Sequence, residues 1–393
     1  MATIQFEPWM LLIFPLFFGM GWLAARIDIK ELLSESSTLP RSYFEGLNFL
    51  LNEQQDEAIE AFIEVVKVDP QTVELHFALG SLFRRRGEVD RALRMHLNLV
   101  ERGDLDDEKR QQALFELGQD YLKAGIFDRA ESTFQSLQST RYEKEALDFL
   151  LEIYQKEKDW LKAIDISQRL AALTGVAQSK EAAFFYCELA AMELAGKQVD
   201  AAVVHLEQAL LTNPQGVRAT IMLGDIALAD SPQKAIEIWK RIEQQDAQYL
   251  PLVAERLLLA YRNSGNENEG IDLLKGYLSK YPSLDLMNVL FNALLQRDGS
   301  DAAYRLVRNE LRQHPTLLGL DKLLEATLLD VKIERRPDVE LVKNLVYQRT
   351  RALAMYRCKR CGFKARQFYW HCPACYGWET YSPRRMEETG AAI

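Results

Sequence analysis

The sequence predicts an all-α protein in which a superhelix of helix pairs follows an N-terminal transmembrane helix and precedes a small C-terminal metal ribbon. Three observations predict it: an uncharged apolar run near the start, a period of about 34 residues in the middle, and two C-x-x-C pairs near the end. Apolar residues make up 48% of the 393 residues, which excludes a wholly disordered or low-complexity chain. The net charge of −9 disfavours a protein coated with nucleic acid.

The apolar run near the N-terminus predicts a membrane anchor. Residues 8–25 carry no charge, and a helix of this length spans about 27 Å, close to a hydrocarbon thickness of roughly 30 Å. A cleaved signal peptide is the alternative, but the residues before the run include no Lys or Arg. We therefore expect a single-pass anchor within residues 1–30. Because Arg26, Lys30 and Arg41 all follow the run, the positive-inside rule places the body of the protein in the cytoplasm.

The central part of the chain repeats a pattern of small and aromatic residues. The trio Gly46, Phe49 and Ala58 recurs after 34 residues, and once more after a short insertion, as Gly80, Phe83, Ala92 and Gly118, Tyr121, Ala130. Small residues at the first and third positions let two antiparallel helices approach closely, and aromatic residues fill the space beside them. Units of this kind centre on Ala58, Ala92, Ala130, Ala163, Ala202, Ala235, Gly270 and Ala303.

This pattern resembles the tetratricopeptide repeat family. The resemblance implies six to eight repeats over residues 39–315, followed by a helical cap and connector over residues 316–353. Stacked repeats form a superhelix whose concave face binds peptides or helices, so we expect a scaffold. The alternative is that the repeats only hold the C-terminal module at a set distance from the membrane.

Four cysteines near the C-terminus predict a metal site. Cys358 and Cys361 form one C-x-x-C knuckle, and Cys372 and Cys375 form the other after ten intervening residues. Each knuckle offers two thiolates from one tight turn, and two knuckles complete a tetrahedron. The knuckles resemble those of rubredoxins and zinc ribbons, which gives a rubredoxin-like ribbon over residues 354–385 and a tail over residues 386–393.

A site closed by four thiolates leaves no position for a substrate or a water molecule, which favours structural Zn²⁺ over a hydrolytic metal. Iron in the same cage is the alternative and would carry electrons. His371 lies beside Cys372 but is expected to be a surface or packing residue rather than a ligand. Cys187 lies in an apolar run and is expected to be a buried, inert thiol.

A basic run lies between residues 341 and 366, with eight Lys or Arg and no Asp or Glu. It is expected to dock on the acidic repeats or on a partner, with anionic lipid headgroups as a second option. Nucleic acid is a third, since nearby aromatic residues offer stacking surfaces, namely Tyr356, Phe363, Phe368 and Tyr369. The chain contains no phosphate-binding loop, no H-E-x-x-H and no G-x-S-x-G motif, so we expect no enzyme.

Taken together, the apolar run, the repeats and the ribbon resemble the lipopolysaccharide assembly protein B family of Gram-negative bacteria. The most specific segments are residues 42–51, 79–84, 86–92, 185–190 and 369–373. The four knuckle cysteines carry over one for one as metal ligands. The resemblance implies an inner-membrane, single-pass protein with a periplasmic N-terminus and a cytoplasmic body.

The same resemblance implies an adaptor that regulates lipopolysaccharide synthesis through protein partners. It presents the lipid A deacetylase to the membrane AAA protease FtsH for turnover. It also associates with lipopolysaccharide transport components and with an inner-membrane protein that senses lipopolysaccharide. No nucleic acid is expected, and the oligomeric state stays open, with a homodimer as one option. The alternative functions are a rubredoxin-like redox protein and a nucleic-acid-binding zinc-ribbon protein tethered to the membrane.

Overall fold

The computed structural model describes Phe18, Met20 and Trp22 together with residues 41–52, 54–68, 73–176 and 179–390. The expected anchor within residues 1–30 therefore lies almost wholly outside the described residues. Across the described ranges, none of the helices combines the length and the apolar character that a membrane crossing requires.

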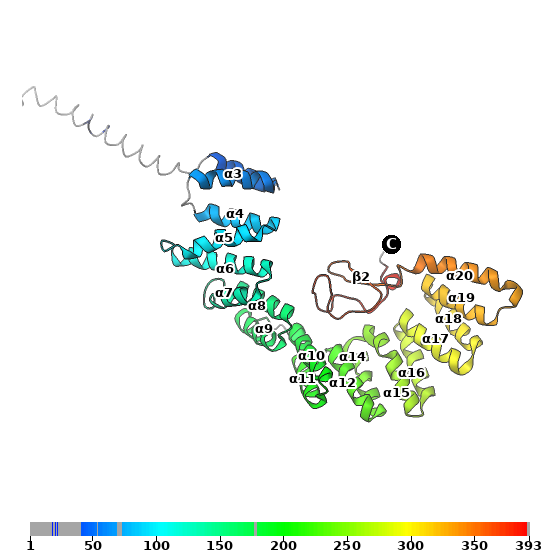
Figure 1. The fold of residues 1–393 in the computed structure, drawn as a ribbon. Coiled ribbons are helices and arrows are strands. Elements are labelled where there is room, and N and C mark those ends of the chain that lie inside the picture. Colours follow the sequence, from blue (N-terminus) through cyan, green and yellow to red (C-terminus); the bar gives the residue numbers. More distant parts are fainter. Residues whose placement is uncertain are drawn as a thin grey trace, which may run out of the picture. The chain divides into compact units, whose positions relative to one another are not determined.

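The chain divides into two compact units, one ending at Ile153 and one beginning at Tyr154. The first unit consists of consecutive helices, of which α2 packs on α3, α4 on α5 and α6 on α7 (Figure 1). Their bounds are α2 (Arg41–Leu51), α3 (Gln55–Val68), α4 (Val73–Arg86), α5 (Val89–Glu101), α6 (Asp107–Ala124) and α7 (Phe127–Gln135), followed by α8 (Glu143–Glu157), which continues into the second unit.

The second unit continues the helix pairs and ends in the ribbon (Figure 1). Its first helices are α9 (Trp160–Thr174), α10 (Ser179–Ala195), α11 (Val199–Thr212), α12 (Val217–Asp230), α13 (Pro232–Lys240), α14 (Ile242–Asp246) and η2 (Ala247–Leu252). The later ones are α15 (Ala254–Asn263), α16 (Glu267–Lys280), α17 (Leu284–Asp298), α18 (Ser300–Gln313), α19 (Leu317–Asp330), η3 (Ile333–Arg335) and α20 (Arg336–Thr350).

The repeat pattern predicted from the sequence is confirmed. All eight of its central small residues are buried, and they lie in α3, α5, α7, α9, α11, α13, α16 and α18. The glycine of a first helix touches a large side chain of the second, because a Cβ on Gly46 would lie 2.5 Å from Phe62 and one on Gly118 would lie 2.7 Å from Phe134. Small residues therefore set the close approach of the paired helices.

The regular period is interrupted once in the second unit. Helix α14 and the 3-10 helix η2, which contains Pro251, are inserted between α13 and α15. The insertion buries Tyr249, whose side chain is 6% exposed. This side chain becomes part of the surface on which the ribbon lies.

The ribbon contains a two-stranded antiparallel sheet, β1 (Tyr356–Arg357) and β2 (Lys364–Ala365), in which Tyr356 lies opposite Ala365. Its own small core consists of Tyr356, Cys358, Cys372 and Tyr381. After the ribbon, η4 (Met386–Thr389) lies within the segment given above as a tail, and Met386 is buried. A core this small is not enough to stabilise a folded module, so the ribbon must gain stability from interactions outside its own core.

Candidate metal centre and its seat on the repeats

The first knuckle begins directly after β1 and is shaped by two backbone hydrogen bonds. The N–H of Cys358 donates to the carbonyl oxygen of Phe363 (2.9 Å), and the N–H of Gly362 donates to the carbonyl oxygen of Cys358 (3.0 Å). Gly362 has a φ of 77°, a left-handed conformation that glycine adopts without strain. The turn brings the side chains of Cys358 and Cys361 to one side.

The second knuckle repeats this turn with a different residue at its bend. The N–H of Cys372 donates to Gly377 (3.0 Å), and the N–H of Tyr376 donates to Cys372 (2.9 Å). Tyr376, the counterpart of Gly362, also has a positive φ, of 55°. The two knuckles are therefore similar in backbone, although a tyrosine adopts the left-handed conformation only with strain.

The structure brings the four predicted cysteines together. Their sulfur atoms all lie within 4.8 Å of one another, and the Sγ atoms of Cys358 and Cys375 are 3.7 Å apart, as are those of Cys361 and Cys372. A tetrahedral metal with sulfur ligands at about 2.3 Å requires sulfur atoms about 3.8 Å apart. A disulfide would require about 2.05 Å. The cluster therefore has the spacing of a four-thiolate metal site.

The hydrogen bonds around Cys358 favour its thiolate form. Burial opposes ionisation of Cys358, but hydrogen bonds from the Thr380 hydroxyl and from the N–H groups of Cys361 and Arg360 lower its pKa to about 6. Elsewhere in the four-thiol cluster the pKa of Cys375 is raised to about 12, chiefly by burial and by the other three thiols, and the pKa of Cys361 is raised as well. The Tyr381 hydroxyl is buried beside Cys372 and has no hydrogen-bond partner within the described part of the chain. A thiolate at Cys372 would supply its acceptor, as outer hydrogen bonds do in metal sites.

His371 belongs to the surface that packs on the repeats rather than to the cysteine cluster. Its ring stacks on Trp378 with centroids 4.2 Å apart, and its Nε2 atom lies 3.0 Å from the carbonyl oxygen of Tyr376. Burial lowers the pKa of His371. The imidazole therefore packs, as expected from the sequence.

Two tryptophans of the ribbon pack on aromatic residues of the repeats. Trp370 stacks on Tyr249 of η2, with centroids 5.2 Å apart and planes 12° apart. Trp378 stacks on Phe184 of α10 at 5.1 Å and 16°, and its indole N–H donates to Gln155 (3.1 Å). We call these contacts the aromatic seat of the ribbon. It buries the ribbon face that its own core leaves open.

A charged contact fixes the other end of the ribbon. Asp285 of α17 binds the guanidinium of Arg385 and accepts a hydrogen bond from the Tyr356 hydroxyl (2.7 Å). The Lys and Arg side chains of residues 341–366 contribute little charge pairing to this docking, because Lys343 lies 3.8 Å from Glu325 and no other basic side chain of the run forms an ion pair in the described ranges. The charged part of the docking therefore depends on Arg385, which lies outside the run.

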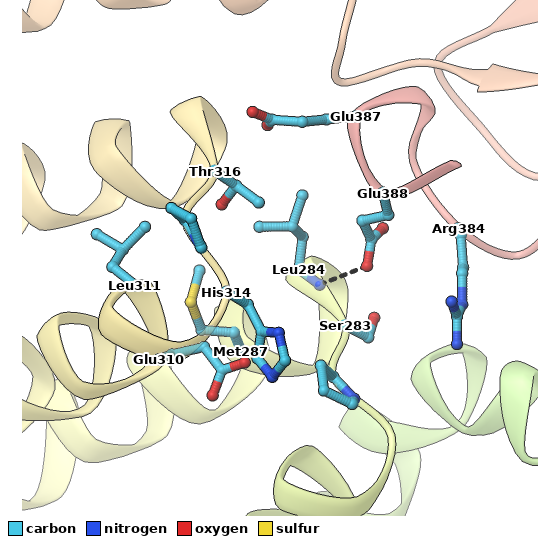
Figure 2. Close-up of a pocket in the computed structure, with 12 residues that line it drawn as sticks. Ser283, Leu284, Met287, Glu310, Leu311, His314, Thr316, Arg384, Glu387 and Glu388 are labelled. Atoms are coloured by element: carbon cyan, nitrogen blue, oxygen red, sulfur yellow. Dashed lines mark hydrogen bonds between the residues drawn. The ribbon is translucent and has the colours of Figure 1, made fainter. Parts of the chain in front are cut away.

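The helix η4 closes the contact by capping two helices of the repeats. The backbone N–H of Leu284, at the start of α17, donates to Glu388 (3.0 Å), and that of Leu318, at the start of α19, donates to Glu387 (2.9 Å). Figure 2 shows Glu388 bonded to Leu284 beside a pocket of about 410 Å³. Carboxylates at helix N-termini satisfy free N–H groups and interact favourably with the helix dipole.

Sequence reasoning identified the four cysteines but not the residues that hold the ribbon on the repeats. The density of aromatic residues around the second knuckle was the available signal for Trp370 and Trp378. Nothing in the sequence pattern distinguishes Asp285 from the other acidic residues of the repeat helices.

Comparisons with known proteins agree with this architecture. A family model described as a rubredoxin metal-binding domain matches residues 356–383, and one described as a tetratricopeptide repeat matches residues 45–107. Lipopolysaccharide assembly protein B of Escherichia coli (strain K12) is 36% identical over 378 residues, which is 95% of this chain and 97% of the relative. The protein of the same name from Haemophilus influenzae is 30% identical over 393 residues, 96% of this chain and 98% of the relative.

Among solved structures, the MamA protein aligns with 43% of this chain and 88% of its own, at 19% identity and a TM-score of 0.33. The structure of Naa15/Naa10 bound to HypK aligns with 79% of this chain and 53% of its own, at 15% identity and a TM-score of 0.39. Scores this low support no conclusion about function.

Proposed function

We propose that this chain, which belongs to the lipopolysaccharide assembly protein B family, acts in lipopolysaccharide assembly as a non-enzymatic adaptor that binds other proteins. The observation that supports this most directly is the seating of a closed four-cysteine cluster on a helical-repeat surface. Repeat surfaces recognise proteins, and four thiolates leave a metal no open position for catalysis.

We further propose that Cys358, Cys361, Cys372 and Cys375 hold Zn²⁺, with iron as the alternative. A bound metal would cross-link the two knuckles. Because Trp370 lies two residues before Cys372 and Trp378 three residues after Cys375, the knuckles position both rings of the aromatic seat. A bound metal would therefore fix the two knuckles relative to each other, and with them the positions of the two tryptophans on the repeats.

The membrane location is also part of the proposal. We place a single-pass anchor within residues 1–30 in the bacterial inner membrane, with a periplasmic N-terminus and a cytoplasmic body. The uncharged run at residues 8–25 and the basic residues after it support this orientation. The repeats over 39–315 and the connector over 316–353 then place the ribbon of residues 354–385 in the cytoplasm.

The partners that we propose are those of the family: the protease FtsH, the lipid A deacetylase, lipopolysaccharide transport components and an inner-membrane protein that senses lipopolysaccharide. An anchored adaptor that binds both a protease and its substrate raises their effective concentration without chemistry of its own. The adaptor would promote turnover of the deacetylase in this way, and thereby limit lipopolysaccharide synthesis.

The test is to measure the half-life of the deacetylase in cells whose own copy of the chain is replaced by variants. The full chain should restore rapid turnover, whereas a Cys358→Ser/Cys361→Ser variant and a variant without residues 1–30 should lengthen the half-life. Capture of FtsH and the deacetylase from gently solubilised membranes should weaken in parallel. Normal turnover with the variant that lacks residues 1–30 would contradict the anchored adaptor, and normal turnover with the cysteine variant would contradict a role for the ribbon.

A further inference from the structure

The first knuckle of the ribbon borders a second pocket, of about 480 Å³, whose lining includes four basic side chains and no carboxylate, together with Cys358 and Cys361 of the cysteine cluster. Arg357 is the last residue of β1, Lys359 and Arg360 lie within the first knuckle, and Arg384 comes from the segment before η4. We call this pocket the basic pocket. Four cations around one cavity attract an anion of matching size.

The cations of the basic pocket are not held in ion pairs. Within the part of the chain that the structure describes, none of the four forms one, although Arg384 interacts electrostatically with Glu388 at longer range. Arg385, the neighbour of Arg384, shows the contrast because it is paired with Asp285 at 2.8 Å. The two acidic residues that follow Arg384 in the sequence are directed to backbone N–H groups: Glu387 accepts from Leu317 and Leu318, and Glu388 accepts from Leu284 and Arg385.

The cysteine cluster does not account for this charge. Four thiolates around a divalent ion carry a net charge of about −2, whereas the lining of the basic pocket carries four positive charges. Lys364 and Arg366 follow on the same strand region and are also exposed and free of ion pairs in the described ranges. A surplus of positive charge therefore remains, on a chain whose net charge is −9.

Two exposed aromatic side chains belong to the knuckles of the ribbon, although neither lines the basic pocket itself. Phe363 follows the first knuckle and is 43% exposed, and Tyr376 follows the second and is 60% exposed. Tyr376 adopts a left-handed conformation, with a φ of 55°, that glycine would adopt at about 1 kcal/mol less. Aromatic residues beside cations are typical of a membrane interface.

The packing of the other aromatic residues argues against nucleic acid in the basic pocket. Tyr356 is 5% exposed and donates to Asp285, and Phe368 packs edge-on against Tyr249 and Trp370. Bases stack on exposed rings, and these rings are already covered by the repeats. The rings that remain exposed, Phe363 and Tyr376, lie at the two knuckles.

We propose that the basic pocket binds the phosphate of an anionic phospholipid headgroup at a membrane surface, with Phe363 and Tyr376 entering the interface beside it. Guanidinium groups bind phosphate oxygens in pairs, and Lys359 adds a further positive charge. This binding is independent of the protein partners proposed above. It would hold the metal ribbon at the membrane by a second contact, apart from residues 1–30.

The experiment uses the full, metal-loaded chain in lipid nanodiscs. One set contains phosphatidylcholine alone, and the other adds a minority of phosphatidylglycerol. Hydrogen exchange of the peptide that covers residues 357–366 should slow several-fold in the phosphatidylglycerol discs only, while exchange in α6 stays unchanged. The Arg357→Gln/Lys359→Gln/Arg360→Gln variant should lose this slowing, because removing three cations lowers the equilibrium constant for binding of the ribbon to the anionic membrane about a hundredfold.

A matched variant controls for net charge. Lys144→Gln/Lys275→Gln/Lys280→Gln removes three exposed cations of the repeats and should keep the slowing. Metal content shows whether the pocket variant retains its ribbon, and Phe363→Ser, which leaves the cations in place, should weaken the slowing. Equal exchange in the two kinds of disc would overturn the proposal. Slowing by inorganic phosphate alone in phosphatidylcholine discs would also overturn it, because the pocket would then bind a soluble anion.

Discussion

Arg385 and Asp285, a hundred residues apart in the sequence, form a bidentate ion pair between the ribbon and helix α17. The Nη2 atom of Arg385 lies 2.8 Å from Oδ1, and Nε lies 3.0 Å from both carboxylate oxygens. The same guanidinium lies over the ring of Tyr356 at 4.0 Å. Burial opposes the charge on Arg385, but Asp285 outweighs it and raises the pKa of Arg385. The pair therefore fixes both the position and the rotation of the ribbon.

Replacing Asp285 should loosen the ribbon from the repeats without removing its metal. Asp285→Asn keeps the shape of the side chain but leaves the half-buried guanidinium without its counter-charge, at about 2 kcal/mol. This corresponds to a roughly thirtyfold increase in the fraction of molecules whose ribbon is detached from the repeats. Native-state hydrogen exchange of the β1 amides measures this fraction. Asp301→Asn removes an exposed partner of Arg305 and should change exchange little, so an equal effect of the two substitutions would contradict the role of Asp285.

The close approach of paired helices predicts opposite effects for two glycine substitutions. A Cβ on Gly224 would lie 2.1 Å from the indole nitrogen of Trp239, which is fully buried, so Gly224→Ala should destabilise the protein by about 1–3 kcal/mol. Gly276 is exposed within α16 and has no neighbour within 4 Å, so Gly276→Ala should stabilise it by about 0.5–1 kcal/mol.

Chemical denaturation of the two glycine variants measures both changes, and the wild-type chain is the common reference. The two substitutions should change the free energy of unfolding in opposite directions. If Gly224→Ala were neutral or stabilising, Trp239 would have to move away from α12 at little cost, and the packing described for the helix pairs would be wrong there.

The features that could be predicted from the sequence, the repeats and the cysteine cluster, depend on local spacing. The contacts between the ribbon and the repeats could not be predicted, because they join residues far apart in the sequence. The spacing from Gly46 to Ala58 recurs because each helix pair solves the same packing problem, so a period is visible without a structure. The cysteine spacing is likewise set by one turn of backbone. The contact of Phe184 with Trp378 joins residues that share no period, and neither residue type indicates the other.

Among the residues of the aromatic seat, Trp378 is expected to contribute most to the free energy that holds the ribbon on the repeats. Its ring stacks on Phe184, meets Trp160 edge-on at 6.2 Å and donates a hydrogen bond to Gln155. Trp378→Ala should weaken docking by about 3 kcal/mol, whereas Trp378→Phe, which keeps a ring but loses the donor, should weaken it by about 1 kcal/mol. Limited proteolysis within residues 354–385 reports the difference, and equal resistance of both variants would show that the ring itself is unimportant.

Cys187 should be unreactive in the folded protein. Burial raises the pKa of its thiol to about 12, so at pH 8 the group is protonated and shielded from solvent. The thiol ionises near pH 9 in the unfolded chain and near pH 12 in the folded chain. The group therefore leaves the free energy of unfolding unchanged below pH 9 and lowers it as the pH rises from 9 toward 12. Alkylation by iodoacetamide at pH 8, located by mass spectrometry, should spare Cys187 in the native protein and modify it in denaturant. Comparable labelling rates in the two states would refute its burial in α10.

Removing the metal should unfold the ribbon and release the helices that it caps. In so small a module the binding energy of the metal largely is folding energy, so Cys358→Ser/Cys361→Ser should lose metal and free Trp370 and Trp378, with a red shift of their fluorescence. The caps from Glu387 and Glu388 should be lost as well, at about 1 kcal/mol each.

Hydrogen exchange distinguishes this coupling from simple loss of a tethered module. It should increase at the first turns of α17 and α19, which receive the two caps, but not within α6 of the first unit. The purified wild-type protein should be colourless if the metal is Zn²⁺ and should absorb visible light if it is iron. Unchanged metal content in the serine variant would contradict the ligand assignment, and unchanged exchange in α17 and α19 would show that their starts do not depend on the ribbon.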